Sequence, residues 1–437
     1  MTQRFSRRHF IQKSAVAGVF SSFSFHGIGR DSDGIRTLSP EELSSLPGRD
    51  ADEEKYWKLI RMQFPLTRKR IYFNTSGLGA SPRFVMNAVY EKMLELETIS
   101  ETGHEQVNEV TKKIARLFHV DPEEIAITRN TTEGMNIFAR EVPLDKGDEV
   151  LLSTHEHPGG AVPWLGVMKD KGIQLKLIEP DYRQPERMTE IVERNLTART
   201  KVVSIDHIPC TTGSLFPVSD ISRLCRDRGI IFGIDGAHPP GQMPVNLREI
   251  DPDFYALSGH KWLFGPKGTG ILFINKRILP RLRPCFVGAY SDREYRFEDL
   301  VLEYKMEANR EEYGTRNTPL VVGLGAAVDF VTAIGVERIQ RRSGKMAAFL
   351  KEELLKIPGV DVLTPLDPSW SASIVTFGIK GMTYARIQKP LLDRFQCRTR
   401  GIFEHGLQAI RISCALYNTF EEMEQLAAAV RTIASEG

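Results

Sequence analysis

Between residues 123 and 274 the chain alternates short apolar runs with longer amphipathic stretches. The runs end in polar or Gly-rich turns, and the stretches between them, such as DISRLCRDRG (220–229), show the helical spacing of apolar residues. Seven runs have this form: EEIAIT (123–128), DEVLLS (148–153), IQLKLI (173–178), KVVSI (201–205), GIIFGI (229–234), DFYALS (253–258) and TGILFI (269–274). Strand and helix in alternation predict an α/β fold, with a mostly parallel seven-stranded sheet that helices cover on both faces.

From about Tyr313 the pattern changes to longer helical segments with a few short strands between them. The helical segments are 321–334, 344–357 and 420–434, and the strands are SIVTFGI (373–379) and AIRISC (409–414). This pattern predicts a second, smaller α+β domain at the C-terminus. The expected organisation is a signal segment (1–30), an N-terminal linker or arm (31–75), a large domain (76–312) and a small domain (313–437).

The first residues follow the order of an export signal. Basic residues come first, and a weakly apolar, Ser-rich run follows over residues 14–25. The motif SRRHFI (6–11) resembles a twin-arginine signal, although Gln12 stands where a lysine is usual. We expect the folded protein to reach the periplasm and to have no stable membrane insertion there. A disordered basic tail on a cytoplasmic protein is the alternative.

Composition narrows the class of protein. Lys and Arg total 58 and Asp and Glu total 56, a formal net charge of +2, and we find no long basic run, so we expect no nucleic-acid partner. No uncharged apolar stretch approaches the roughly 20 residues of a membrane span, which excludes a polytopic membrane protein. The five cysteines are widely spaced and form no CxxC, so neither a disulfide scaffold nor a zinc knuckle is indicated.

Chemically active side chains follow five of the predicted strands directly. They lie in RNTTEG (129–134), THEH (154–157), DH (206–207), DGAH (235–238) and SGHK (258–261). In an open parallel sheet, ligands bind outside the carboxyl ends of the strands, so these side chains are expected at one site. The start of the helix after RNTTEG is a natural anion site, although Asn130 or Thr131 could simply be its cap.

Pyridoxal phosphate (PLP) chemistry uses all of these groups together. The cofactor needs a lysine to hold it as an aldimine, an acid at its ring nitrogen, a flat group against its ring and an anion site for its phosphate. Lys261 can be the lysine, Asp235 the acid and His157 the stacking group. The candidate phosphate ligands are Thr131, Thr132, Ser258 and His260.

Residues 235–274, from DGAHPPG to HKWLFGPKGTGILFI, resemble the cofactor region of class V, fold type I PLP enzymes. This family includes the cysteine desulfurases and isopenicillin N epimerase, and DGAHPPG with HKWLFGPKG is most similar to the epimerase branch. Further matches follow in family order, namely YFNTSGLGASP (72–82), NTTEGMN (130–136), EYGTRN (312–317) and AIRISCALYNTFEEME (409–424). Several motifs in order along most of the chain make a chance match unlikely.

The resemblance implies roles for individual residues. It implies Lys261 as the aldimine lysine, Asp235 as the partner of the ring nitrogen and His157 as the stacking residue. It implies that Thr132, Ser258 and His260 hold the phosphate and that His238 lies near the ring edge. Lys267, in GPKG, is interpreted as a turn residue.

The resemblance also implies how substrate and subunits are arranged. Arg411 would bind the substrate carboxylate, a task that suits a planar bidentate donor. Thr315, in the segment Gly314-Thr315, would reach the phosphate bound by the neighbouring subunit. A homodimer with shared active sites is therefore expected.

Departures from the family pattern bear on the reaction. Cysteine desulfurases carry a cysteine shortly before the arginine that corresponds to Arg411, whereas RGIFEHGLQAI (400–410) has none. We therefore expect epimerase-like or aminotransferase-like action on an amino acid or amino-acid-like amine, with a C–S lyase or β-lyase as the alternative. Core roles are expected for Cys397 and Cys414. Cys210 stands where the desulfurases place an asparagine, so Thr211 or Thr212 would have to supply that contact.

Three other classes of protein are alternatives to a PLP enzyme: a metal-dependent hydrolase, a P-loop nucleotide binder and an inactive cofactor-binding scaffold. His155-x-His157, with Asp206, His207 and His238, also has the residue types of a metal-dependent hydrolase. That interpretation leaves the Asn-Thr-Thr helix start unexplained. GPKGTG lacks the spacing of a P-loop, and the presence of both Lys261 and Arg411 argues against an inactive cofactor-binding scaffold.

Overall fold

The computed structural model describes residues 34–49, 51 and 54–436. The export signal predicted over residues 1–30 lies outside the described residues, so it stays a prediction. The segment predicted as a linker or arm contains two helices, α2 (Pro40–Ser44) and α3 (Glu54–Met62), and the short strand β1 (Ile71–Tyr72). Ser39 and Glu42 form a capping box at the start of α2, which explains why so short a helix is stable there.

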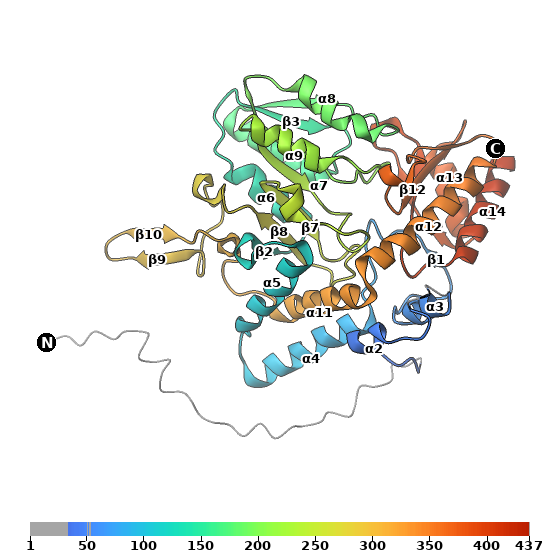
Figure 1. The fold of residues 1–437 in the computed structure, drawn as a ribbon, viewed down its shortest axis with the longest axis horizontal. Coiled ribbons are helices and arrows are strands. Elements are labelled where there is room, and N and C mark those ends of the chain that lie inside the picture. The colour runs from blue at the N-terminus through green and yellow to red at the C-terminus, as the bar shows by residue number, and fades with distance from the viewer. Residues whose placement is uncertain (1–33, 50, 52–53, 437) are drawn as a thin grey trace. The chain divides into compact units, whose positions relative to one another are not determined.

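A seven-stranded sheet forms the centre of the fold (Figure 1). Its strands are β2 (Ile125–Thr128), β3 (Glu149–Ser153), β4 (Gln174–Ile178), β5 (Thr200–Asp206), β6 (Ile231–Asp235), β7 (Phe254–Ser258) and β8 (Gly270–Ile274). They are the seven predicted apolar runs, in the order β2-β8-β7-β6-β5-β3-β4. Only β8 runs antiparallel to its neighbours, so the expected mostly parallel sheet is confirmed.

Helices cover both faces of this sheet, because alternate strand residues point to opposite sides. On β5, Val202 belongs to one apolar core and Val203 to the other. The core of Val202 includes α6 (Thr131–Glu141) and α7 (Pro158–Lys171). The core of Val203 is built with α5 (Glu105–Phe118), α8 (Met188–Asn195), α9 (Val218–Asp227), α10 (Leu247–Ile250) and α11 (Thr318–Ile334). Helix α4 (Arg83–Ile99) packs against α11.

The C-terminal part has its own sheet and its own core. The sheet is antiparallel in the order β11 (Val360–Val362), β12 (Ile374–Ile379), β15 (Ala409–Ser413) and β14 (Arg400–Ile402). Helices α12 (Val336–Leu355), α13 (Tyr384–Asp393) and α14 (Phe420–Glu436) pack on it. This is the smaller α+β unit expected from the sequence. The boundary at 313 stays a prediction, since α11 lies beyond it and shares the core of the large sheet.

Some short strands were missed from the sequence. β9 (Asp292–Arg296) and β10 (Val301–Tyr304) form a hairpin that extends from the body of the fold (Figure 1). Strand β1 pairs with β13 (Cys397–Arg398). The hairpin strands are mostly charged and exposed, and β1 and β13 have two residues each, so neither shows an apolar period.

Within the described residues, no single helix has the length and apolar composition of a membrane span. The helices α11 and α12 pass that test only when taken together across a bend of 74°.

Candidate active site

Three strands of the large sheet end side by side at its carboxyl edge. The register pairs Asp206 of β5 with Asp235 of β6, and Asp235 with Ala256 of β7. Asp206 is 2% exposed and Asp235 is 3% exposed. The predicted site residues that follow these strands therefore do come together at one edge, as the topology requires.

Lys261 lies three residues after β7, in a loop fixed by backbone hydrogen bonds. The N–H of Gly259 donates to the carbonyl of Thr269 at 2.9 Å, and the N–H of Gly79 donates to the carbonyl of His260 at 2.7 Å. A Cβ on Gly79 would lie 2.0 Å from the Lys261 carbonyl oxygen, so glycine is required there. Burial lowers the pKa of Lys261, and the nearby Asp235 opposes this shift. An amine that loses its proton more easily is a better nucleophile and base.

One carboxyl oxygen of Asp235 is hydrogen-bonded to the backbone, and no described residue donates to the other. Its Oδ1 accepts a hydrogen bond from the N–H of Ala237 at 3.0 Å. Burial raises the pKa of Asp235, whereas Lys261 and this hydrogen bond lower it. Behind it the ring of Tyr255 fills the space beside Gly236, where a Cβ would lie 1.9 Å from the ring. The carboxyl group is thus fixed in place and can pair with a cation at the sheet edge.

His157 begins helix α7 and presents a neutral ring. Its Nδ1 accepts a hydrogen bond from the N–H of Gly159 at 3.0 Å, which places the ring proton on Nε2. Desolvation, reinforced by the charges of Lys261 and Arg400, lowers the pKa of His157 to about 4. The imidazole is partly open to solvent and uncharged near neutral pH, which suits a flat group that stacks on a ring.

The start of α6 lies beside the end of β7. The hydroxyls of Thr131 and Ser258 are 2.7 Å apart, and the N–H of Thr131 donates to the Ser258 hydroxyl at 3.2 Å. Thr132 is exposed, and its hydroxyl lies 2.5 Å from where a Cβ on Gly159 would be. The N-termini of α6 and α7 therefore meet here, and free helix N–H groups with hydroxyls suit a phosphate.

Asn130 is the cap of the helix, which was one of the two interpretations of the helix start. Its side-chain oxygen accepts a hydrogen bond from the N–H of Glu133 at 2.9 Å, so Asn130 is the cap of α6. Thr131 and Thr132 do not serve that purpose. Their hydroxyls remain available to the site.

Arg411 is a buried cation without a counterion. It lies on β15 and is 2% exposed. Its Nη1 donates to the carbonyl of Cys210 and its Nη2 to the side-chain oxygen of Asn74, both at 3.1 Å, while Nε has no partner. No carboxylate of the described residues pairs with it. Burial lowers its pKa to about 10. A buried guanidinium with free donors is suited to an incoming carboxylate.

A tight turn packs against this site. Strands β14 and β15 form a hairpin whose turn spans 403–408. Arg400 forms an ion pair with Glu404, and the ring of His405 stacks on His155 with centroids 4.9 Å apart. The turn is short, is held by these contacts and contains no cysteine.

Two cysteines near this turn belong to the core. Cys397 and Cys414 are buried, and the sulfur of Cys414 lies 3.9 Å from that of Met423. Burial raises the pKa of each thiol to about 12. Both thiols are therefore protonated near neutral pH, which agrees with the expected core roles.

Cys210 is buried at the site, where its carbonyl holds Arg411. Burial raises the pKa of its thiol. The neighbouring hydroxyls have other partners, since Thr211 contacts His155 at 2.7 Å and Thr212 contacts Ser214 at 3.0 Å. The contact predicted for Thr211 or Thr212 in place of the asparagine of the desulfurases stays a prediction.

Two of the predicted cofactor residues lie apart from this group or behind it. His238 is 3% exposed and its Nδ1 has no partner. Thr315 is exposed and lines a separate cavity with Arg129, Gly268 and Arg316. Within one chain, no recorded contact of the described residues joins Thr315 to Lys261.

Comparison with known proteins decides the family. A sequence profile described as aminotransferase class-V matches residues 85–426. The chain belongs to this family. The probable cysteine desulfurase of Xylella fastidiosa is 30% identical over 402 residues, which cover 86% of this chain and 94% of that protein. The probable cysteine desulfurase of Methanothermobacter thermautotrophicus is 28% identical over 406 residues, or 86% of this chain and 98% of its own length.

Solved structures agree with the assignment to aminotransferase class-V. The apo cysteine desulfurase of Thermococcus onnurineus has a TM-score of 0.79 at 26% identity, and covers 86% of this chain and 98% of its own. The cystine C–S lyase C-DES, solved with its product cysteine persulfide, has a TM-score of 0.78 at 26% identity, with 84% and 99% covered. The fold type I architecture expected from the sequence is confirmed.

PLP is the cofactor of this class V protein. The residues present fit it, because the carboxyl edge of the sheet holds buried polar atoms that have no protein partner. Nδ1 of His238 and Nδ1 of His260 are such atoms. They lie with a lysine, an acid, a neutral ring and a helix start, which are the groups that this cofactor requires.

The family assignment argues against the metal-dependent hydrolase that the histidines suggested. In the part of the chain that the structure describes, no group of three or more His, Cys, Asp or Glu side chains is placed to hold a metal ion. His155 and His157 point to different partners, Thr211 and the N–H of Gly159.

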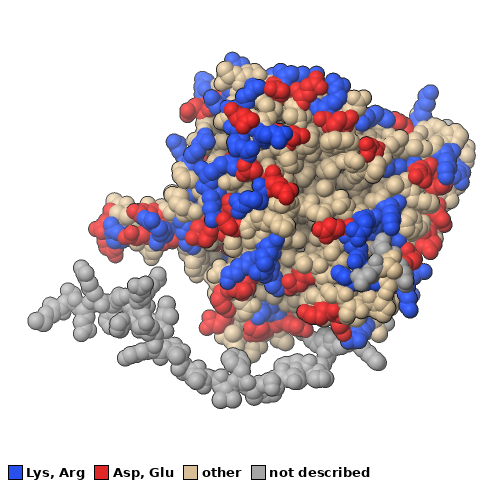
Figure 2. Space-filling model, in the orientation of Figure 1, with Lys and Arg blue, Asp and Glu red and all other residues tan. Residues whose placement is uncertain are grey.

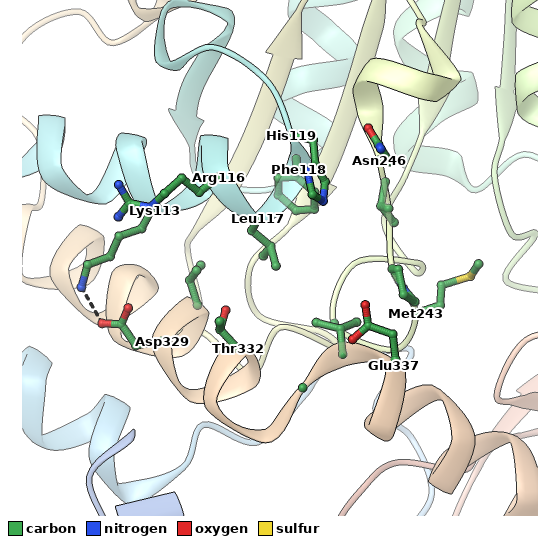
Figure 3. Close-up of a pocket in the computed structure, with 16 residues that line it drawn as sticks. Lys113, Arg116, Leu117, Phe118, His119, Met243, Asn246, Asp329, Thr332 and Glu337 are labelled. Carbon is green, nitrogen blue, oxygen red and sulfur yellow. Dashed lines mark hydrogen bonds and ion pairs between the residues drawn. The ribbon is translucent and has the colours of Figure 1, made fainter. Parts of the chain in front are cut away.

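Outside this site, the part of the chain that the structure covers has a face of mixed charge and a further cavity. Lys and Arg side chains intermingle with Asp and Glu on the face in Figure 2. A cavity of about 400 Å³ lies between α5, the α11–α12 junction and residues 241–246 (Figure 3). Its charged lining residues include Lys113 and Asp329, which pair with each other. None of the predicted site residues lines it.

Sequence reasoning assigned no role in the PLP site to Asn74, Arg400 or Glu404, and none to Glu156. Asn74 lies in the quoted motif YFNTSGLGASP, so its place near the site could have been suspected. Glu156 directly follows a buried strand, which is also a usable signal. Arg400 and Glu404 reach the site only through the β14–β15 hairpin, whose first strand, β14, is too short to predict.

Proposed function

We propose that the protein removes the α-proton of an amino acid, or of an amino-acid-like amine that carries a carboxylate, and acts as an epimerase or an aminotransferase does. The observation that carries this proposal is Arg411, a buried cation that has no carboxylate partner among the described residues and lies near Lys261. A carboxylate bound there would neutralise Arg411 and leave the substrate amine free to face Lys261.

Each residue has a definite task in this proposal. PLP, when bound, supplies the electron sink for the electrons of the Cα–H bond. Lys261, with its lowered pKa, carries the proton to and from the α-carbon. Asp235 holds the proton of the ring nitrogen in place, and the neutral ring of His157 lies against the cofactor face. Thr131, Thr132, Ser258 and His260 hold the phosphate.

Among the described residues, the one thiol at the site is that of Cys210, which is buried and whose pKa burial raises. The turn over residues 403–408 contains no cysteine, and Cys397 and Cys414 are buried core thiols with raised pKa values. Although the similar proteins of known structure and sequence include cysteine desulfurases, this chain lacks a reactive thiol on that turn. This difference favours chemistry at the α-carbon over transfer of sulfur to the enzyme.

A C–S lyase is the second candidate. The likeness to C-DES, which is named a cystine C–S lyase, favours it, because elimination at the β-carbon begins with the same α-proton transfer. The residues described above would bind a cystine-like substrate in the same way. The two candidates differ in whether a leaving group departs.

A product assay in deuterated water separates these reactions. We expect purified holoenzyme to incorporate deuterium at Cα of its amino-acid substrate without sulfide release. An epimerase would invert Cα, and an aminotransferase would convert the substrate to its keto acid when a second keto acid is added as amino acceptor. Release of pyruvate with sulfide or persulfide from L-cystine or L-cysteine would replace the proposal by the lyase. Alanine with transferable sulfur would indicate a desulfurase.

We also propose that the protein is a homodimer in which each subunit completes the site of the other. Thr315 is exposed and remote in its contacts from Lys261 within one chain. Large apolar side chains are exposed on α4 and on the β9–β10 hairpin, among them Tyr90, Leu94, Phe297 and Leu300. Exposed apolar side chains in such number favour a protein partner.

The shared site can be tested by mixing subunits. Thr315→Ala should weaken PLP binding roughly 10- to 100-fold, the effect of one hydrogen bond to a charged group. A hybrid of Lys261→Ala and Thr315→Ala subunits should regain one site of wild-type PLP affinity. Hybrids that stay as weak as Thr315→Ala alone, or a monomer in sedimentation, would contradict the proposal.

A further inference from the structure

A buried group of three carboxyls lies behind the candidate cofactor site, and only one of them has been given a role. Asp235 ends β6, Asp206 ends β5 in register with it, and Glu156 follows β3. Glu156 is 8% exposed and Asp206 is 2% exposed. We call Glu156, Asp206 and Asp235 the carboxyl cluster.

The cluster contains acid oxygens that no protein donor satisfies. Oε1 of Glu156 accepts from the Ser153 hydroxyl at 2.8 Å and from the N–H of Asp206 at 3.1 Å. Oε2 of Glu156 and Oδ2 of Asp206 are both buried, and neither has a hydrogen-bond partner among the described residues. Burying a charged carboxylate without hydrogen bonds costs much free energy of folding, whereas burying the neutral, protonated acid costs far less.

The free oxygen of Glu156 points to the same place as Asp235. A Cβ on Gly160 of α7 would lie 3.4 Å from Oε2 of Glu156 and 3.4 Å from Oδ2 of Asp235. The Met135 side chain of α6 closes that space with an apolar group. Oδ2 of Asp235 has no recorded hydrogen bond from the described residues, so an acid proton on Glu156 lies close to the face of Asp235 that serves the cofactor.

Few charges compensate the cluster. The charge of Asp235 acts on Glu156, to which the backbone N–H of Asp206 also donates. The charges that act on Asp206 are those of Glu156, Asp235, the Cys210 thiol and Lys261. Lys261 is the cation that acts on both Asp206 and Asp235, and one cation cannot support three negative charges in a buried site. Burial raises the pKa of Glu156 to about 8 and raises that of Asp206 well above its usual value. At least one proton is therefore kept in the cluster near neutral pH.

We propose that Glu156 and Asp206 are positioning residues that hold a shared proton behind Asp235 and thereby set the charge that Asp235 presents to the ring nitrogen of PLP. While the shared proton is present, Glu156 and Asp206 together carry one negative charge and Asp235 carries another. When that proton leaves, a further negative charge appears in the cluster and holds protons more firmly on Lys261 and on the cofactor. The proposal rests on the PLP cofactor and not on which reaction follows.

The test is a pH titration of the visible absorption of the bound cofactor, without substrate. In the wild-type holoenzyme we expect two coupled steps. Glu156→Gln, which keeps the shape and cannot ionise, should leave one step, with its midpoint lowered by about one pH unit or more. Asp206→Asn should move the midpoint in the same direction.

Glu149→Gln is the matched control. Glu149 is also a buried carboxyl, at the other end of β3, where the hydroxyls of Thr197 and Thr200 satisfy it. Its variant should titrate as the wild type does. Curves for Glu156→Gln and Asp206→Asn that match the wild type, in variants that fold and bind PLP, would overturn the proposal.

A measurement on the wild type covers the case in which the variants fail to fold. Infrared difference spectra between apoenzyme and holoenzyme near neutral pH should show the carbonyl stretch of a protonated carboxyl that shifts when PLP binds. The lack of such a band would overturn the shared proton. Since no substrate is present in either experiment, a failed substrate assay and a failed titration remain distinguishable.

Discussion

Lys261→Ala is expected to abolish turnover, with a loss of at least roughly a thousandfold, while the protein still binds PLP without a covalent bond. The physical reason is that one amine serves both to hold the cofactor and to move the α-proton, and proton transfer by a placed side chain alone contributes about 10²–10⁴. The measurement is the steady-state rate together with peptide mapping after borohydride reduction. The wild type should carry the reduced adduct on Lys261, and the variant should carry none.

Lys267→Ala provides the control for this experiment. Lys267 is exposed in the turn before β8, as the sequence suggested, and its charge acts on His260 without a hydrogen bond to it. Its variant should keep both the turnover and the adduct. Activity that survives in Lys261→Ala would remove the covalent role of this lysine.

The fold was predictable because six of the seven strands of the large sheet are buried on both faces and appear as continuous apolar runs. The seventh, β4, is a partly exposed strand at the sheet edge, and its apolar run was still found. The polar residues directly after these runs were predictable as a site for a related reason, since parallel strands deliver their carboxyl ends to one edge. Lys261, Asp235 and His157 follow from that rule and from the chemistry that PLP demands.

Other features could not be predicted, because they depend on contacts between residues that are far apart in the sequence. The contact of Arg411 with Asn74 joins residues more than three hundred positions apart. The charge state of Glu156 depends on the β5–β6 register, which sets Asp206 beside Asp235. The β9–β10 hairpin mixes charged side chains with exposed apolar ones and is little buried in a single chain, so it has no apolar period.

The arrangement links the two parts of the chain through the N-terminal arm. Phe73 accepts a hydrogen bond from Ser413 of β15 at 2.9 Å, and Gly79 contacts the Lys261 loop. Between them Asn74 holds Arg411. The arm thus sets the carboxylate-binding group and the proton-carrying group relative to each other, which determines how a substrate lies at the site.

Arg411→Ala should mainly lower kcat/KM for substrates that carry a carboxylate, because the variant removes the buried cation that would bind the carboxylate. Losing one side of a buried charge pair costs about 2 to 5 kcal/mol, which corresponds to roughly 30- to 5,000-fold in kcat/KM. The measurement is kcat/KM for an amino acid and for the matching amine without the carboxylate. The wild type should prefer the acid by this factor, and the variant should lose the preference.

Two further comparisons separate binding from folding in the Arg411 experiment. Arg411→Lys keeps the charge but loses the bidentate fork, so it should fall between the wild type and the alanine variant. Burial lowers the pKa of Arg411 but leaves the guanidinium charged near neutral pH, so the wild-type preference for the acid should not change with pH there. If Arg411→Ala lowers kcat/KM equally for the amino acid and the amine, and the thermal unfolding of the variant is unchanged, the carboxylate binds elsewhere.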